Sequence, residues 1–438
     1  MNSVYVTVLT VFKDKWIYLM AYPIRHSRAW LVWTIAVIYY LYEYIHRIAP
    51  SVMVSDLMHS FQVNAATLGN LSAIYFYVYA FFQVPVGMLA DRYGPKRPLL
   101  IACIICSLGG IFFSMAHHLY WAQFNRGLIG LGSAFGYICC LRLIINWFPK
   151  KQFALMCGLV NMVGMIGAVF GENIMSHIIG LLTWREIILY LSLFGGIITL
   201  LISLFIKDFP ISSKKIKPHS QNLLTQQPIL HHLTSIITKP QIWFISLYVA
   251  TLYCSFDTLA ALWGIPYLQG IYKLSLIQAT SIASTIFVGG IFGFLFFGFL
   301  TTHTHNKNKL TMVISACIVL INALILNQQP SNIIIVRCLF FVLGFCAGSL
   351  STATDLLKSQ IPNNISGLAI GVLNLTLVTI GALSQPLFGY LLQIGHASAT
   401  TLSVFQASDF HRAFILMPCL FVVSVLCALL TKQIDNPR

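Results

Sequence analysis

The sequence predicts an all-α integral membrane protein in which twelve transmembrane helices form two parallel six-helix repeats. The chain has 438 residues, of which 58% are hydrophobic and only 8% are charged. Soluble domains carry about 25% charged residues, so this chain has too few charges to cover a water-facing surface. The mean hydropathy of +0.82 agrees with this conclusion. Lipid is therefore the expected surrounding of most of the protein.

Twelve apolar segments are long enough to cross a bilayer, which takes about 20 residues. The first six are 29–55, 65–90, 98–117, 120–147, 152–177 and 186–206. The second six are 241–266, 276–301, 309–327, 332–357, 364–393 and 410–431. The expected domains are thus an N-terminal half (29–206) and a C-terminal half (241–431). A polar linker that is amphipathic or flexible (207–240) joins them, and short segments (1–28 and 432–438) lie at the two termini.

Lysine and arginine gather in alternate loops, which accounts for the formal net charge of +15. Examples are Lys96 and Arg97, Lys150 and Lys151, and the linker. This positive-inside pattern predicts that both termini and the linker are cytoplasmic. It also argues against nucleic acid as a partner. The eleven cysteines lie mostly in apolar segments without paired-metal spacing, so we expect no metal site.

The two halves share countable spacings. Pro149, Gly158 and Asn161 in the first half have the same offsets as Pro362, Gly371 and Asn374 in the second. The distance from Val63 to Gly87 equals that from Leu274 to Gly298. Two six-helix halves in the same orientation are a parallel repeat, which predicts a solute site between them near the bilayer midplane.

A motif between the second and third predicted helices carries a family resemblance. Residues 87–97 read GMLADRYGPKR, and this run resembles the G-x-L-x-D-R-x-G-x-K/R signature of the major facilitator superfamily. Residues 126–134 of the fourth helix, RGLIGLGSA, resemble the second motif of the family. The resemblance implies the major facilitator fold and gating or conformational roles for Gly87, Asp91, Arg92, Gly94, Lys96, Arg97 and Arg126.

A narrower resemblance covers residues 39–97. The runs YEYIHRIAPSVM at 42–53 and GNLSAIYFYVY at 69–79 are similar to those of bacterial transporters of the intraphagosomal amino-acid type. That resemblance implies an amino acid or similar small zwitterion as the substrate and a bacterial inner membrane as the location. Nucleosides and siderophore-like solutes also occur in related lineages, so the substrate class stays open.

Ionisable side chains inside predicted spans are costly and mark candidate sites. Glu43, His46 and Arg47 share one face of the first helix because they are three or four residues apart. Arg47 suits a substrate carboxylate, His46 is a second substrate contact, and Glu43 is a proton carrier. The alternative is an internal ion pair of Glu43 with Arg47 that only fixes the helix.

Other ionisable residues complete the predicted site. Asp257 in the seventh helix lies at nearly the depth of Glu43 in the repeat, so it is expected to take a proton or a substrate ammonium across the two halves. Glu172 in the fifth helix is a further proton-coupling candidate. Arg126 is expected to support gating or proton transfer; the alternative is an arginine that reaches out to the membrane surface.

These features predict a secondary active transporter, which imports an amino acid or similar zwitterion with protons by alternating access. Organic-anion, nucleoside or siderophore transport and efflux remain the alternatives. No nucleotide-binding or hydrolase motif occurs, so we expect neither ATP-driven transport nor an enzyme. No cofactor is expected beyond the proton gradient. The expected partners are a small-molecule substrate and the lipid bilayer, and the expected working unit is a monomer.

Overall fold

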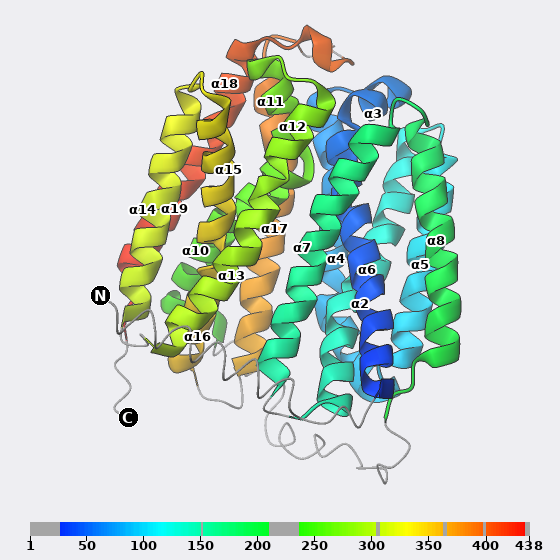
Figure 1. The fold of residues 1–438 in the computed structure, drawn as a ribbon. Helices are drawn as coiled ribbons and strands as arrows, with labels where there is room; N and C mark the ends of the chain where they lie inside the picture. Colours follow the sequence, from blue (N-terminus) through cyan, green and yellow to red (C-terminus); the bar gives the residue numbers. More distant parts are fainter. Residues whose placement is uncertain are drawn as a thin grey trace.

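The computed structural model describes residues 27–149, 152–209, 236–303, 307–361, 366–396 and 400–433. Every regular element in these ranges is a helix. The helices run side by side in two groups, α2–α8 and α10–α19 (Figure 1). Eleven of the described segments are long and apolar enough to cross a membrane. The twelfth helix of the bundle is α2 (Ser27–Val52), which carries Glu43, His46 and Arg47, and the predicted helical membrane fold is confirmed.

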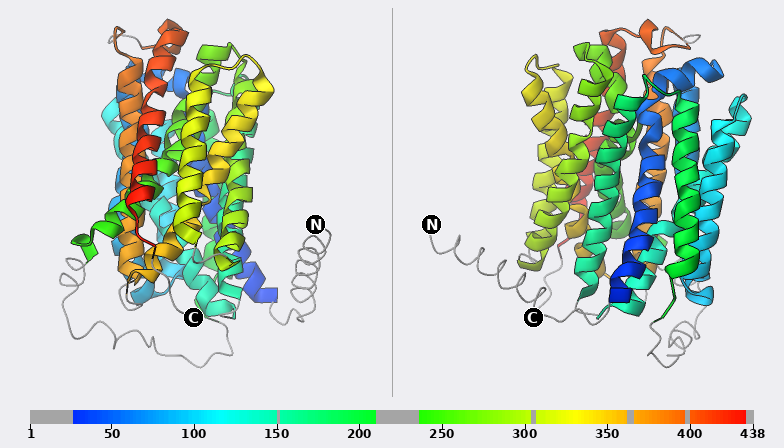
Figure 2. Two further views of the ribbon diagram at one scale, coloured as in Figure 1. Left: turned by 90° about the vertical axis from the view of Figure 1, so that its left-hand side faces the viewer. Right: turned by 45° about the vertical axis from the view of Figure 1, so that its right-hand side comes forward.

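Helices of the first half begin and end close to the predicted positions. The span predicted at 120–147, for example, is α6. The bounds are α2 (Ser27–Val52), α3 (Val54–Phe61), α4 (Ala65–Tyr93), α5 (Lys96–Ser114), α6 (Leu119–Trp147), α7 (Phe153–Ile178) and α8 (Trp184–Phe205). The short helix α3 was not predicted; it lies across the end of the bundle (Figure 2).

Helices of the second half are more often interrupted. Their bounds are α10 (Pro240–Cys254), π-helix η3 (Ser255–Trp263), α11 (Gly264–Tyr272), α12 (Leu276–Ala283), α13 (Thr285–His303), α14 (Asn308–Asn327), α15 (Ile333–Ala347), α16 (Leu350–Ser359), α17 (Ser366–Leu392), η5 (Leu402–Val404), α18 (Ala407–Phe414) and α19 (Leu416–Leu430). Four spans predicted as single helices therefore contain breaks. The apolar length of a segment reports that it crosses the membrane but not where its backbone bonding changes.

Several sequence features fall outside the described residues. These are the segment 1–26, most of the linker (210–235), the tail 434–438, and the positions of Lys150, Lys151 and Pro362. The predicted domain boundaries at 28 and 431 therefore stay predictions.

The two ends of the bundle differ in how the halves meet. We name them the motif end, where α4 turns into α5 at Gly94, and the α3 end, opposite to it. At the α3 end the halves touch: a Cβ added to Gly69 of α4 would lie 2.7 Å from the carbonyl oxygen of Gln385 in α17. Nearby, Asn173 of α7 donates to the hydroxyl of Ser284, beside α13, at 3.1 Å. Contacts of this kind close the α3 end.

At the motif end the same four helices stand apart. A Cβ added to Gly87 of α4, Gly158 of α7, Gly298 of α13 or Gly371 of α17 would meet no atom of the described residues within 4 Å. A cavity of about 250 Å³ lies between α7 and α13 and is lined by both Gly158 and Gly298. The space between the halves is therefore open at the motif end and closed at the α3 end.

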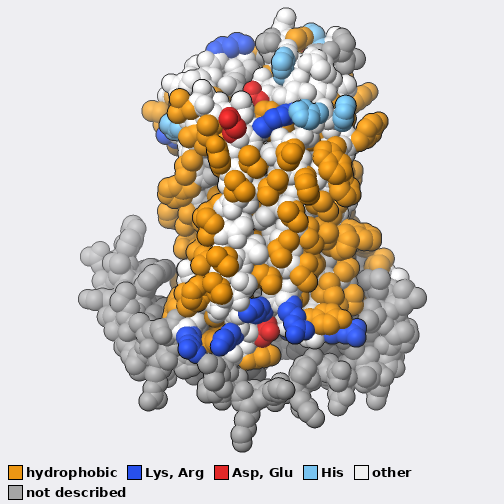
Figure 3. All heavy atoms as spheres, turned by 90° about the vertical axis from the view of Figure 1, so that its right-hand side faces the viewer, with side chains coloured by type: hydrophobic (Ala, Val, Ile, Leu, Met, Phe, Trp, Pro, Cys, Tyr) orange, Lys and Arg blue, Asp and Glu red, His pale blue; other side chains and the backbone are white. Residues whose placement is uncertain are grey.

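The surface carries a broad hydrophobic band around the bundle (Figure 3). Lysine and arginine side chains gather at its motif end, and histidines lie towards the α3 end. An apolar band with charges at its rims is the surface expected of a protein that crosses a bilayer. The band therefore agrees with the apolar spans of the sequence.

Candidate functional site

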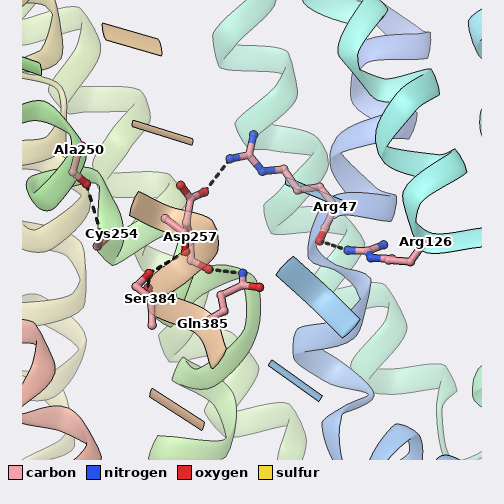
Figure 4. Close-up of polar contacts among 9 residues, drawn as sticks. Arg47, Arg126, Ala250, Cys254, Asp257, Ser384 and Gln385 are labelled. Atoms are coloured by element: carbon pink, nitrogen blue, oxygen red, sulfur yellow. Dashed lines mark hydrogen bonds and ion pairs between the residues drawn. The ribbon is translucent and has the colours of Figure 1, made fainter. Parts of the chain in front are cut away.

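A buried ion pair joins the two halves where α2 meets η3. Nη2 of Arg47 donates to Oδ1 of Asp257 at 2.6 Å (Figure 4). The side chain of Asp257 is 1% exposed and that of Arg47 is 13% exposed. The guanidinium carbon also lies 5.3 and 4.8 Å from the ring centroids of Tyr44 and Phe76. The structure brings the predicted residues Arg47 and Asp257 together; their roles in binding and coupling stay predictions.

Arg47 lies three residues before Pro50, a proline inside α2. Pro50 has no N–H, so the helix cannot satisfy the carbonyl of His46 in the usual way. Arg126 of α6 supplies the missing donor: its Nη1 bonds the carbonyl of His46 at 2.7 Å, and its Nη2 also bonds that of Arg47 at 2.9 Å. Arg126 is 2% exposed, with its guanidinium over the ring of Tyr75. The alternative of an arginine that reaches the membrane surface is therefore wrong.

Asp257 lies in a second irregular helix. The π-helix is a rare form, in which each N–H bonds the carbonyl five residues earlier, and it is frequent at functional sites. Gln385 of α17 donates from Nε2 to the main-chain carbonyl of Asp257 at 2.6 Å. Thr258 and Ser384 share a hydroxyl hydrogen bond, and Nε1 of Trp263 donates to the carbonyl of Gln385 at 2.8 Å. Neither the π-helix nor its contacts with α17 were predicted.

Glu43 is buried in the first half, at 2% exposure. It lies against Gly136 of α6, where an added Cβ would be 3.0 Å from its carboxyl carbon. Its Oε2 has no hydrogen-bond partner among the described residues. The alternative of an internal Glu43–Arg47 pair is wrong for this structure, since the carboxylate that Arg47 contacts is that of Asp257. Glu43 is thus a buried acid without a contacting cation in the described chain.

His46 points away from the ion pair. Its ring packs edge-on against Tyr42, with centroids 4.8 Å apart, and faces Gly110 of α5. Both ring nitrogens lack hydrogen-bond partners among the described residues. The structure therefore does not bring His46 into contact with Asp257, and this geometry does not favour its predicted contact with substrate.

Glu172 of α7 faces α2. It is 0% exposed, and the hydroxyl of Ser51 donates to its Oε1 at 3.0 Å. Its Oε2 has no partner among the described residues. Glu43, Arg47 and Ser51 follow one another at four-residue spacing, so α2 links the three predicted acids, Glu43, Asp257 and Glu172, along one stripe.

The motif turn is held by contacts within the first half. Asp91 pairs with Arg142 of α6 near the surface, and such exposed pairs contribute about 0–1 kcal/mol. The exposed side chain of Arg92 lies over the ring of Tyr93, and Arg97 is exposed. The gating roles of the motif residues stay predictions.

Asp208, which was not a predicted site residue, fixes the other side of the turn. Its Oδ1 accepts from the backbone N–H of Lys96 at 2.7 Å, and so satisfies a free donor at the start of α5. The ammonium group of Lys96 donates to the carbonyl of Ser203 at 2.8 Å. The only sign of this contact in the sequence was that Asp208 closely follows an apolar span in the same half as the motif turn.

Gly94→Ala is expected to lower the stability of the motif turn by about 1–2 kcal/mol. Gly94 has φ of +77°, in the region that L-residues avoid, and its added Cβ would lie 2.8 Å from the carboxyl carbon of Asp208. Thermal unfolding of the purified protein measures the effect. Gly180→Ala is the control, because its Cβ would meet nothing within 4 Å. Equal melting temperatures for the two variants would contradict this reading of the turn.

Two similar helical halves with a buried ion pair between them define a polytopic membrane transporter. The model of the Major Facilitator Superfamily matches residues 32–386, and the chain belongs to this superfamily. Members of the family are transporters, so the expectation of a protein that is not an enzyme is confirmed.

Curated relatives include a probable galactarate/D-glucarate transporter, GarP, of Escherichia coli K12. It is 22% identical over 92% of this chain and 94% of its own length. The sialic acid transporter NanX of the same organism is 23% identical over 67% of this chain and 71% of its own. The narrower resemblance to an amino-acid transporter group is not confirmed by these relatives.

Solved structures show the same fold. A bacterial homologue of the human lysosomal transporter Spinster, in an inward-facing and unoccupied conformation, superposes with a TM-score of 0.75 and 15% identity. The match covers 93% of this chain and 97% of that one. The occupied inward-facing form gives a TM-score of 0.74, again at 15% identity, over 91% and 96% of the two chains.

Proposed function

We propose that the protein is a proton-coupled importer of a small organic acid, working by alternating access in a bacterial inner membrane. The motif end faces the cytoplasm in this proposal, as the charge distribution along the sequence favours. The observation that carries the proposal is the Arg47–Asp257 pair, a desolvated cation held between the two halves by a titratable partner. A planar guanidinium is well suited to bind a carboxylate.

The pair offers a direct route to coupling. With Asp257 ionised, Arg47 is occupied and an incoming carboxylate must compete for it. Once Asp257 takes a proton, Arg47 loses its anionic partner. The carboxylate of the substrate then takes the place of the Asp257 carboxylate beside Arg47 and carries the same negative charge. Proton and substrate then load together, and the halves rock about the occupied site. Glu43 and Glu172 are the proposed sites for further protons.

An amino acid fits this exchange less well than an organic acid. The ammonium group of a zwitterion would need Asp257 ionised, so Asp257 could not also release Arg47 by protonation. The relatives support the same ranking, because their names specify sugar acids and sialic acid. An amino acid stays the second candidate, since Arg47 and Asp257 together match the two charges of a zwitterion. This order reverses the one that the sequence suggested.

The test is uptake into proteoliposomes with an imposed inward proton gradient. The panel contains D-glucarate, galactarate, sialic acid, amino acids and nucleosides. Accumulation of an organic acid that stops when a protonophore collapses the gradient supports the proposal. Accumulation of amino acids alone would overturn the substrate class, and gradient-independent accumulation would overturn proton coupling.

Coupling is expected to depend on Asp257 more than on Glu43. Asp257→Asn removes the proton acceptor that contacts Arg47, so gradient-driven accumulation of the acid should fall at least tenfold, while counterflow at equal pH persists. Glu43→Gln should leave more of the gradient-driven signal, because Glu43 does not contact Arg47. Both variants are measured by gradient-driven uptake and by counterflow. Full gradient-driven accumulation in both variants would exclude these acids as the essential proton carriers.

A further inference from the structure

Asp257 is held from two directions by one turn of α17. Its carboxyl group lies against Gly381, where an added Cβ would be 2.8 Å from the carboxyl carbon. Its main-chain carbonyl accepts the 2.6 Å hydrogen bond from Gln385, four residues further along α17. Gly381 therefore leaves room for the side chain while Gln385 fixes the backbone of the same residue.

Gln385 is bonded to η3 at two points. Besides its bond to Asp257, its own carbonyl accepts from the indole of Trp263, the last residue of the π-helix. Trp263 also stacks on Phe388 of α17, with ring centroids 5.7 Å apart. Gln385 is 0% exposed, so these bonds lie in a dry environment, where an unsatisfied polar group costs about 1–3 kcal/mol. The π-helical segment is thus anchored to α17 near both of its ends.

The first half contains a counterpart of this arrangement. Arg47 lies close to Pro50, which removes a backbone hydrogen bond from α2, and Arg126 of α6 bonds the carbonyls of His46 and Arg47. Each partner of the ion pair therefore lies in an irregular helix, and in each case a buried side chain of another helix in the same half donates to its main-chain carbonyl (Figure 4). The geometry on the Asp257 side depends on Gln385 as that on the Arg47 side depends on Arg126.

We propose that Gln385 is a positioning residue for Asp257: its amide holds the π-helical turn against α17 and thereby sets the contact between Asp257 and Arg47. Gln385 itself contacts the backbone of Asp257 and not its carboxylate. The role concerns the geometry of the ion pair in the protein without substrate. It therefore stands whichever solute is transported.

The experiment is an infrared titration of the Asp257 carboxyl group in purified full-length protein in lipid, with no substrate added. The C=O band of the protonated carboxyl is assigned by its loss in Asp257→Asn. Gln385→Met keeps the length and approximate volume of the side chain but removes the donor. If the turn relaxes, the carboxylate moves from Arg47 and binds its proton more readily. The band should then appear at a pH about one unit higher than in the unmodified protein, a tenfold change in proton affinity.

Gln393→Met is the matched control. Gln393 is also hydrogen-bonded through its side-chain amide, by accepting from the backbone N–H of Ala66 in the first half at 3.2 Å, but it lies beyond the end of α17 and away from Asp257. This variant should titrate like the unmodified protein. If Gln385→Met does not fold, Gln385→Asn is used, because its shorter amide does not reach the carbonyl.

An unchanged midpoint in a folded Gln385 variant would overturn the proposal, even where the melting temperature falls, because a purely structural role predicts that result. An equal shift in Gln393→Met would overturn it as well, since the effect would then belong to α17 packing in general.

Discussion

Arg47→Gln is expected to abolish organic-acid uptake and to destabilise the protein by about 3–5 kcal/mol, as when one partner of a buried ion pair is removed. Asp257, at 1% exposure, would keep a buried charge without the cation that contacts it. The cation–π contacts to Tyr44 and Phe76 would be lost too. Uptake in proteoliposomes and thermal unfolding in detergent measure the two effects.

The double variant Arg47→Gln/Asp257→Asn separates the two consequences. A neutral amide pair leaves no uncompensated charge, so most of the lost stability should return while uptake stays absent. Arg185→Gln serves as the control, because Arg185 bonds a carbonyl of the first half at the beginning of α8, away from the site. A double variant as unstable as Arg47→Gln would show that the pair is not a coupled unit.

Gly158→Phe and Gly298→Phe are expected to stop turnover by preventing closure of the motif end. At the closed α3 end, glycines let α4 and α17 approach to backbone contact, as at Gly69. Gly158 of α7 and Gly298 of α13 both line the cavity of about 250 Å³ between these helices at the open end. A phenyl ring would fill part of this space and hold the halves apart. Uptake should fall at least 100-fold, while binding of the transported acid and the melting temperature change little.

Gly196→Phe provides the matched control. A Cβ at Gly196 of α8 also meets no atom of the described residues within 4 Å, yet α8 belongs to the first half and contributes no residue to the lining of the cavity. This variant should transport normally. Spin labels placed on α7 and α13 at the motif end report the closure directly. A Gly158→Phe protein that still samples the short distance would contradict the account of the gate.

The fold followed from the sequence because lipid imposes simple demands. Backbone groups in the bilayer core must bond within a helix, so twenty-residue apolar runs read as spans with few exceptions. The bounds predicted for α6 and α7 differ from the observed ones by one residue at most. The paired spacings around Gly158 and Gly371 likewise predicted two halves, and both glycines lie at the open motif end.

The site was predicted less completely. Charged residues inside apolar spans are rare enough to be recognised one by one, which is why Glu43, Arg47 and Asp257 were found. The partner of each was harder to predict: the helix stripe suggested Glu43 for Arg47, and the structure pairs Arg47 with Asp257. Gln385 is uncharged and Asp208 lies just outside the predicted spans, so neither was recognised as a charge inside a span, and their contacts were missed.

The sequence by itself determined the membrane setting, the helical spans and the residues that carry buried charge, because hydropathy and charge are properties of the chain alone. Only the tertiary structure decided which charges meet, which end of the bundle is open, and where α2 and η3 depart from regular helix. Those features depend on contacts between distant helices, such as Gln385 with Asp257. No local pattern specifies a contact between residues more than a hundred positions apart.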